Sequence, residues 1–508
     1  MTRLTVACSP AMARNPSSRR NWLRILLVLA AILAAGALYA WRSLVPPAPL
    51  ALPPRGAVLE DVTVVNPGAD RAQHRTVKVE GEAIASIEAA PPNPTSPWVG
   101  YTVLPGLVDM HVHFPPPTGL GQTELFAFLF LLHGVTTVRD AGDVDGTATA
   151  PARDGVRLGR FPGPRVFACG PFVDGPSPLW PNSRVVHDAA EARAAVAKIA
   201  EEGFDCVKAY DRLSADALVG LKEEAAKHGL PVIGHVPWAV AYLDARYDDV
   251  QHLTGIGANP GDTRPFPARL DVEKSEAEID ELVRRTVELG IANTPTLVTM
   301  ERIRSTRDYA AARRSAGALL VPRLYRDAVW SPTGSRLLGS LTPADYDLLD
   351  RVSERSRRLV GKLHRAGAEL HTGSDVLNPF VVPGESLWRE LALFVESGLT
   401  PEEAWKAGTR TSAAFLGKTK LPALGTLAPG APADLLVFRE DPTRDLAKLA
   451  TLEAVVADGR LYTREMLDDQ LARYRRYADG WLFDRVSVAV TQRLLARLAA
   501  SQPPVDPH

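Results

Sequence analysis

The chain has 508 residues, 46% of them hydrophobic, which is enough for more than one packed unit with a sizeable core. Its 58 basic and 59 acidic residues nearly cancel, to a formal net charge of -1. Such a balance provides no broad basic surface for DNA or RNA, so we expect no nucleic-acid partner.

Residues 1–54 form a segment of their own that indicates export or membrane anchoring. A basic lead with Arg19 and Arg20 precedes an uncharged, Ala/Leu-rich run from Ile25 to Trp41, as in signal peptides and signal-anchor helices. Cleavage and anchoring both stay open. The stretch "SRRNWLR" resembles the bacterial twin-arginine export motif, and a plain basic region for the general secretory route is the alternative. By either route we expect the folded part in the periplasm or elsewhere outside the cytoplasm, attached to the inner membrane if the run is retained.

The stretch "VPPAPLALPPR" that follows this run predicts an extended spacer between the membrane and the folded part, because proline favours extended backbone. Cysteines are scarce. Cys8 lies in the leader, and Cys169 and Cys206 are too few for a disulfide scaffold. We therefore expect both of these to be buried small hydrophobic residues.

Short β-rich segments occur at both ends of the globular part. They lie in residues 55–103 and again in residues 418–462, separated by Gly, Pro and Asn. Short β-rich segments broken by such turn residues predict that the two parts pair in one small β-sandwich. Residues 463–508 are expected to be a helical extension.

Residues 104–417 alternate apolar strands with amphipathic helices, which is typical of a parallel sheet with crossover helices. Eight strand candidates, from "TVLPGLVDMHVHF" to "GAELHTGSD", predict an α/β fold of the (β/α)8 TIM-barrel type. The span exceeds the roughly 250 residues of that fold, mainly at about 298–366. We expect this Arg- and Leu-rich stretch to be helical and to form a lid.

Residue types that bind metals recur at the ends of these strands. In "LPGLVDMHVHF", His111 and His113 lie two residues apart and project from the same face of a strand. Four more candidates end the fourth, fifth, sixth and eighth strands, and TIM barrels carry their chemistry at such ends. These are Lys208, His235, His252 and Asp375.

Each candidate also has an ordinary role: a core histidine, a helix N-cap for Asp375, a surface lysine for Lys208. Their joint occurrence favours a metal site. Lys208 shares a strand face with Cys206 and is expected to point into the barrel, where an ammonium would repel metal ions. A lysine amine of lowered pKa can instead add CO2, and the resulting carbamate can bridge two cations.

Seven motifs in order resemble the amidohydrolase superfamily, in particular its imidazolonepropionase-like and prolidase-like branch with a binuclear metal centre, over about residues 56–460. They are "LPGLVDMHVHF", "GVTTVRDAG", "VKAYDRLS", "PVIGHVP", "QHLTGI", "HTGSD" and "GTLAPGAPADLLVF". The resemblance implies two divalent ions, usually zinc, held by imidazole, carboxylate and carbamate groups. The first ion would take His111, His113, Lys208 and Asp375, and the second would take Lys208, His235 and His252.

This site is expected to hydrolyse a C–N bond, amide or peptide-like, in a small-molecule substrate. A hydroxide that bridges the metals would attack the carbonyl, and Asp375 would accept its proton and pass it to the departing amine. Tyr210, in a "KAY" position common in this branch, would hydrogen-bond the substrate, unless it only packs at the rim. The fold also suits a lactone, carbamate or phosphotriester hydrolase and a mononuclear deaminase, and an inactive binding or scaffold protein is a different class that stays open.

The sequence also departs from the pattern of the branch. Gln251 stands where many relatives have Glu, and Trp388 stands where His is frequent. These changes bear on substrate preference. His371 and Arg139 lie near strand ends without an assigned role.

Overall fold

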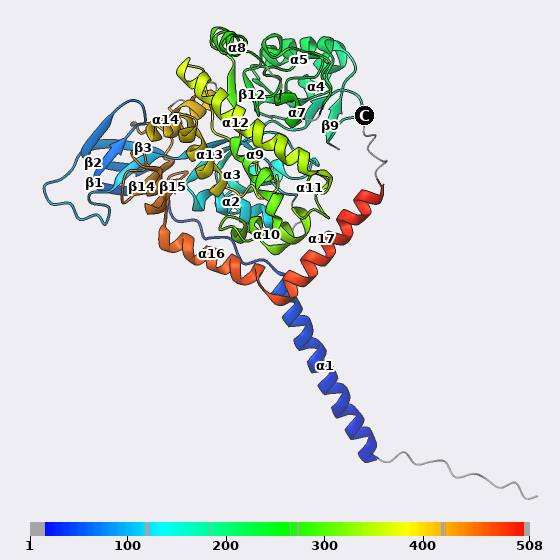
Figure 1. The fold of residues 1–508 in the computed structure, drawn as a ribbon. Coiled ribbons are helices and arrows are strands. Elements are labelled where there is room, and N and C mark those ends of the chain that lie inside the picture. Colours follow the sequence, from blue (N-terminus) through cyan, green and yellow to red (C-terminus); the bar gives the residue numbers. More distant parts are fainter. Residues whose placement is uncertain are drawn as a thin grey trace, which may run out of the picture.

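The structure is a computed structural model that describes residues 16–116, 121–180, 182–264, 266–271, 274–417, 421 and 423–501. Cys8 and the first part of the leader lie outside these ranges. Figure 1 shows a long N-terminal helix, a β-sheet made from segments before and after the central barrel, the barrel itself, and two C-terminal helices. The predicted domain limits stay predictions.

A long helix, α1 (Pro16–Leu44), projects from the body of the molecule (Figure 1). Within Asn21–Leu44, an 18-residue window has a mean hydropathy of 2.3, and none of that window is buried by the rest of the chain. It is long and apolar enough to cross a membrane, as predicted, and a signal sequence has the same properties.

The spacer after α1 lies along the body of the molecule (Figure 1), and its role as a separation from the membrane stays a prediction. Gln470 donates a hydrogen bond of 3.0 Å to the carbonyl of Ala48, and Arg460 donates to the carbonyl of Pro53. Proline-rich backbone has carbonyls without internal partners, so it is readily held along a protein surface. The spacer is therefore attached to the folded domain immediately after the end of α1.

The two β-rich segments do pair and form one seven-stranded sheet, and the sandwich arrangement stays a prediction. The order is β16-β15-β14-β4-β1-β2-β3, and the antiparallel contact of β4 with β14 joins the segment before the barrel to the one after it. The sheet covers an apolar core that includes Val62, Val103 and Val437. Its strands are β1 (Ala57–Val65), β2 (Arg71–Glu80), β3 (Ala83–Ala89), β4 (Thr102–Pro105), β14 (Leu435–Phe438), β15 (Leu452–Ala457) and β16 (Arg460–Thr463).

Parallel strands of the central segment form the wall of a barrel. One sheet has the order β5-β6-β7, and another has the order β8-β10-β11-β12-β13, with a short β9 (Ser183–Val185) beside β8. The bounds are β5 (Leu107–Val112), β6 (Val135–Asp140), β7 (Arg165–Ala168), β8 (Phe172–Asp174), β10 (Val207–Ala209), β11 (Val232–Gly234), β12 (Asp249–Gln251) and β13 (Ala292–Thr294).

Backbone contacts close this wall into a ring. The amide of Asp205, before β10, donates to the carbonyl of Ala168 at 2.7 Å, so β7 and β8 share the third position. At the other end, Leu370 bridges Asn293 in parallel, and the amide of Met110 donates to the carbonyl of Thr372 at 2.9 Å. Residues 370–372 thus supply the eighth strand position, as expected of a TIM barrel.

The first predicted strand is divided at Gly106. Residues before it belong to the terminal sheet as β4, and residues after it enter the barrel as β5. A Cβ atom at Gly106 would lie 2.0 Å from Oγ1 of Thr136. Only glycine allows the chain to pass so close to β6 while it changes sheets.

Helices follow the barrel strands and cover its outside. The stretch expected to be helical at about 298–366 is largely so, and its role as a lid stays a prediction. The helices and helical turns of the barrel segment are α2 (Gln122–Leu132), α3 (Thr149–Arg157), α4 (Ala189–Glu201), α5 (Ala215–His228), α6 (Tyr242–Ala245), α7 (Phe266–Leu270), α8 (Glu276–Glu288), α9 (Leu297–Ser305), η1 (Thr306–Asp308), α10 (Tyr309–Ala312), η2 (Ala318–Leu320), η3 (Tyr325–Val329), α11 (Arg336–Ser340), α12 (Pro343–Arg365), α13 (Glu385–Glu396), α14 (Pro401–Lys406), η4 (Ala407–Thr411) and α15 (Ser412–Gly417). A further turn, η5 (Leu446–Thr451), precedes β15.

Cys169 and Cys206 form a disulfide, which corrects the prediction of two separate thiols. Both are buried, as expected. They are 37 residues apart in sequence but follow β7 and precede β10, which are neighbours in the wall. The disulfide and the exposed apolar helix α1 both indicate a location outside the cytoplasm.

The C-terminal extension is helical, with α16 (Arg464–Ala478) and α17 (Trp481–Ser501). In Figure 1, α16 runs below the barrel to the point where α1 departs, and α17 leaves that point in another direction.

Candidate metal centre

Two histidines and an aspartate come together at the carboxyl ends of the first and eighth barrel strands. His111 lies in β5, His113 follows it, and Asp375 follows the strand formed by residues 370–372. The Nε2 atoms of both histidines lie 3.4 Å from Oδ1 of Asp375. One ligand atom from each of the three residues lies within 4.8 Å of the others.

The Nδ1 atoms of these two histidines face away from Asp375 and are held by the barrel. His113 Nδ1 donates to the carbonyl of Gly142 at 2.7 Å, and His111 Nδ1 donates to Oε1 of Gln251 at 2.5 Å. A neutral ring in either position carries its proton on Nδ1, so its Nε2 has a lone pair on the side that faces Asp375. This is the tautomer that a metal ligand needs.

The two later histidines adjoin this group. The ring of His252 lies 4.5 Å from that of His111, and its Nδ1 lies 3.9 Å from Oδ2 of Asp375. His235 lies 5.0 Å from His252, ring centre to ring centre. The structure therefore brings all four predicted histidines into one largely buried cluster beside Asp375.

Lys208, on β10, is 1% exposed. Burial lowers the pKa of its ammonium to about 7, although the charge of Asp375 acts in the opposite direction. A substantial fraction of the amine is therefore uncharged at neutral pH. Only an uncharged amine can add CO2, so the environment of Lys208 suits the carbamate that the sequence predicts.

Charges in the cluster keep Asp375 ionised. Burial by itself would raise the pKa of this carboxyl, but His252, His113 and Lys208 together outweigh burial and hold it below its ordinary value. Asp375 also has a left-handed backbone, with a φ of 61°, and its amide donates to the carbonyl of His111 at 2.6 Å. Backbone conformations of this rarely populated kind cluster at functional sites.

Tyr210, predicted to contact substrate, stacks on His235 with ring centres 4.3 Å apart. Its hydroxyl accepts a hydrogen bond of 2.9 Å from Nε1 of Trp180, and Phe172 packs edge-on against its ring. The phenol is thus placed beside the cluster by an aromatic wall, which fits either a substrate contact or packing.

These donors fit a divalent metal ion. Two imidazole nitrogens and one carboxylate, all largely buried and within 4.8 Å, are a donor set that zinc binds in proteins. His235, His252 and Lys208 surround this group without belonging to the same 4.8 Å set.

Three residues hold the Nδ1 atoms of these histidines in ways that sequence reasoning did not predict. Gln251, which was connected only with substrate preference, contacts His111. Asp211 and Thr296 were missed: Oδ1 of Asp211 lies 3.3 Å from His235 Nδ1, and the hydroxyl of Thr296 lies 2.5 Å from His252 Nδ1. Asp211 directly follows the "KAY" motif, so its position was the available signal. Thr296 carries no sequence signal, because its contact depends on the packing of β13 against β12.

Arg139 and His371 take part in a buried network below the cluster. Arg139 donates to Oδ2 of Asp249 at 2.5 Å, and His371 Nδ1 lies 3.4 Å from the same oxygen. Gln251 Nε2 donates to this oxygen at 2.8 Å. Trp388 has a different partner: its Nε1 donates to the carbonyl of His133 at 2.8 Å.

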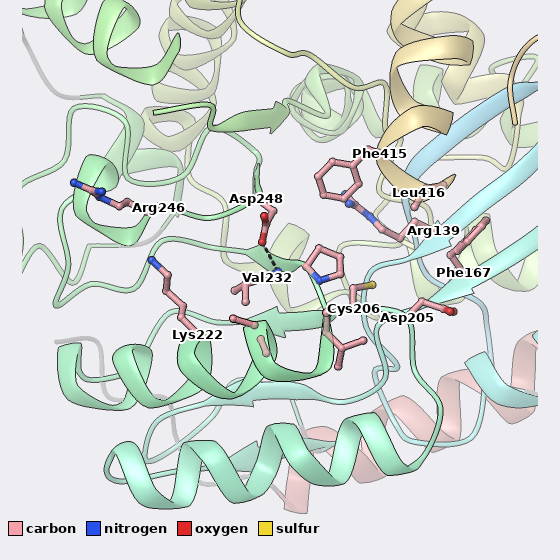
Figure 2. Close-up of a pocket in the computed structure, with 15 residues that line it drawn as sticks. Arg139, Phe167, Asp205, Cys206, Lys222, Val232, Arg246, Asp248, Phe415 and Leu416 are labelled. Atoms are coloured by element: carbon pink, nitrogen blue, oxygen red, sulfur yellow. Dashed lines mark hydrogen bonds between the residues drawn. The ribbon is translucent and has the colours of Figure 1, made fainter. Parts of the chain in front are cut away.

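The cavity shown in Figure 2 is separate from the cluster of predicted metal ligands. Its volume is about 430 Å³, and Asp205 and Cys206 before β10 and Pro231 before β11 line it together with Phe415. These residues lie at the amino ends of the strands, whereas the predicted ligands lie at or near the carboxyl ends. The cavity contains none of those ligands.

A model of the amidohydrolase family matches residues 102–462. The chain belongs to this family. The superfamily resemblance of its motifs is thereby confirmed, and the protein is a hydrolase of that family with a candidate His-His-Asp metal site.

Solved structures agree with this assignment. Bottromycin amidohydrolase is 28% identical, with a TM-score of 0.66 over 84% of this chain and 91% of that one. A Xaa-Pro dipeptidase with bound methionine is 18% identical, with a TM-score of 0.60 over 80% and 100% of the two chains. A putative prolidase from Bifidobacterium longum is 22% identical, with a TM-score of 0.59 over 83% and 99%. The last two show the shared fold. The sequence matches no curated protein.

Proposed function

We propose that this amidohydrolase cleaves an amide or peptide-like C–N bond in a small molecule outside the cytoplasm, with two divalent metal ions, most simply zinc. The observation that carries the proposal is the convergence of His111, His113 and Asp375 within 4.8 Å. The likeness to bottromycin amidohydrolase, an amide hydrolase by its name, supports this bond type.

The residues would share the two ions as the motifs predict. His111, His113 and Asp375 would hold the first, His235 and His252 the second, and Lys208 would bridge them as a carbamate. When bound, such ions lower the pKa of a shared water toward neutrality and polarise the substrate carbonyl.

The chain's own groups then handle the proton and the substrate. Asp375 is ionised and lies within 3.4 Å of both His111 and His113, so its carboxylate is placed to accept a proton during attack and return it to the leaving nitrogen. Tyr210 would orient the substrate through its hydroxyl. The histidines stay fixed because Gly142, Gln251, Asp211 and Thr296 hold their Nδ1 atoms.

Metal content and substrate range test this proposal. The full chain, purified without chelator, should contain about two ions per chain and cleave members of a panel of dipeptides and N-acyl amino acids. Asp375→Asn should abolish cleavage, whereas Asp347→Asn, on the exposed surface of α12, should not. A metal-free protein would favour an inactive scaffold, and preferential cleavage of lactones or phosphotriesters would reassign the bond type.

A further inference from the structure

The end of α1 meets the C-terminal extension at one point of the surface (Figure 1). The hydroxyl of Tyr477, at the end of α16, donates to the carbonyl of Leu44 at 3.1 Å. Helices α1 and α17 also contact each other there. The place where a membrane-spanning α1 would leave the bilayer is therefore attached to the base of α17.

Two exposed tryptophans lie at this junction. Trp41, one turn before the end of α1, is 69% exposed, and Trp481, the first residue of α17, is 63% exposed. The guanidinium of Arg485 lies 5.5 Å from the ring centre of Trp481. Tryptophan is enriched at the level of lipid headgroups, where its ring is partly buried and its N–H stays hydrated.

The outer face of α17 also combines exposed apolar side chains with arginines. Val486, Val490 and Leu494 are spaced four residues apart, so they form one stripe, and all three are exposed. Arg493 and Arg497 are exposed beside them. No acidic residue occurs from 485 to 501.

The inner face of α17 is held by the barrel, which fixes the direction of this stripe. Asp484 forms an ion pair of 2.6 Å with Arg323, Ser487 is buried, and Gln492 donates to the carbonyl of Asp327. The apolar and basic side chains therefore cannot turn inward without loss of these contacts.

We propose that Trp41, Trp481 and the outer face of α17, together called the α17 surface, rest on the bilayer that α1 enters. Continuity with α1 identifies the occupant, because Leu44 is the last residue of the span and is bonded to the helix that precedes α17. Apolar side chains would enter the interface, and arginines would bind anionic headgroups. The docked spacer then holds the catalytic barrel against the membrane.

Fluorescence quenching by lipids tests this. The full chain with Cys8→Ser and Val490→Cys has one thiol outside the disulfide, which can carry a fluorophore. The protein is placed in vesicles of phosphatidylethanolamine and phosphatidylglycerol that contain a lipid-attached quencher. The matched control is Val219→Cys on α5, which is 54% exposed against 48% for Val490. Leu33→Cys on α1 reports insertion of the span.

Quenching at position 490 should be at least threefold stronger than at position 219. It should fall toward the control with Arg485→Gln, Arg493→Gln and Arg497→Gln combined, or in vesicles of phosphatidylcholine alone. Equal quenching at positions 490 and 219 would overturn the proposal, as would absence of quenching at position 33. Cross-linking between copies through position 490 without lipid quenching would assign the surface to self-association instead.

Discussion

Gln251 precedes the predicted ligand His252 in the chain, yet its side chain supports another ligand 140 residues away. Its Oε1 lies 2.5 Å from Nδ1 of His111, and its Nε2 donates to Asp249, which Arg139 holds in turn. The side-chain amide of Gln251 has one favourable orientation, because the carboxylate of Asp249 accepts from its Nε2 and the N–H of His111 donates to its Oε1.

Removal of this acceptor should weaken metal binding. Gln251→Leu should lower the metal affinity about 10- to 100-fold, the usual range for the loss of a group that orients a ligand. Gln251→Glu keeps an acceptor for His111 and should retain more affinity. Competition with a chromogenic chelator measures both. Gln470→Leu, a buried glutamine far from the centre, controls for packing, and unchanged affinity in Gln251→Leu would contradict the orienting role.

Lys208→Ala should abolish metal binding and activity together, because both ions lose a shared anionic ligand. Small carboxylic acids added to this variant should restore part of both by filling the gap. Lys208→Glu should retain some metal, since its carboxylate replaces the carbamate imperfectly. Elemental analysis and turnover are the measurements, with Lys222→Ala on α5 as the matched control. Two bound ions and full turnover in Lys208→Ala would rule out the bridging carbamate.

Loss of the disulfide should destabilise the barrel wall. With a sequence separation of 37 between Cys169 and Cys206, the chain-entropy estimate is about 4 kcal/mol for Cys169→Ser combined with Cys206→Ser. Chemical denaturation of the oxidised and doubly substituted proteins measures the difference. Thiol titration of the unfolded full chain should find one free thiol before reduction and three after it, because the sequence has three cysteines. Three free thiols before reduction would contradict the bond.

His133 should make the fold less stable in acid. Burial lowers its pKa to about 4, whereas the unfolded chain has a value near 6.5. Between these values the unfolded state binds the extra proton, so stability is intact above about pH 6.5 and is lost as the pH falls. The loss approaches about 3 kcal/mol near pH 4.

The variant His133→Asn isolates this contribution. Its amide can keep a donor near the carbonyl of Leu129, which accepts from His133 Nδ1 at 2.8 Å. The stability difference between wild type and variant, from denaturation at pH 7 and pH 4.5, should shift in favour of the variant at the lower pH. An equal difference at both values would show that His133 does not titrate on unfolding.

Local patterns in the sequence were sufficient to predict the barrel and to bring together the residues of the candidate centre. The alternation of strands and helices predicts parallel strands, and the ends of such strands converge, so His111, His113, His235, His252 and Asp375 could be brought together without coordinates. The apolar run that became α1 depends on composition alone and was equally visible.

Contacts between distant segments were decided only by the tertiary structure. Gly106 divides one apolar run between two sheets because β6 passes too close for a side chain. Cys169 and Cys206 become partners because β7 and β10 are neighbours in the barrel wall, which no spacing rule states. Gln251 supports His111 for the same reason. Side-chain type and periodicity are properties of a segment, whereas close approach, pairing and orientation belong to two segments at once and appear only when the chain is folded.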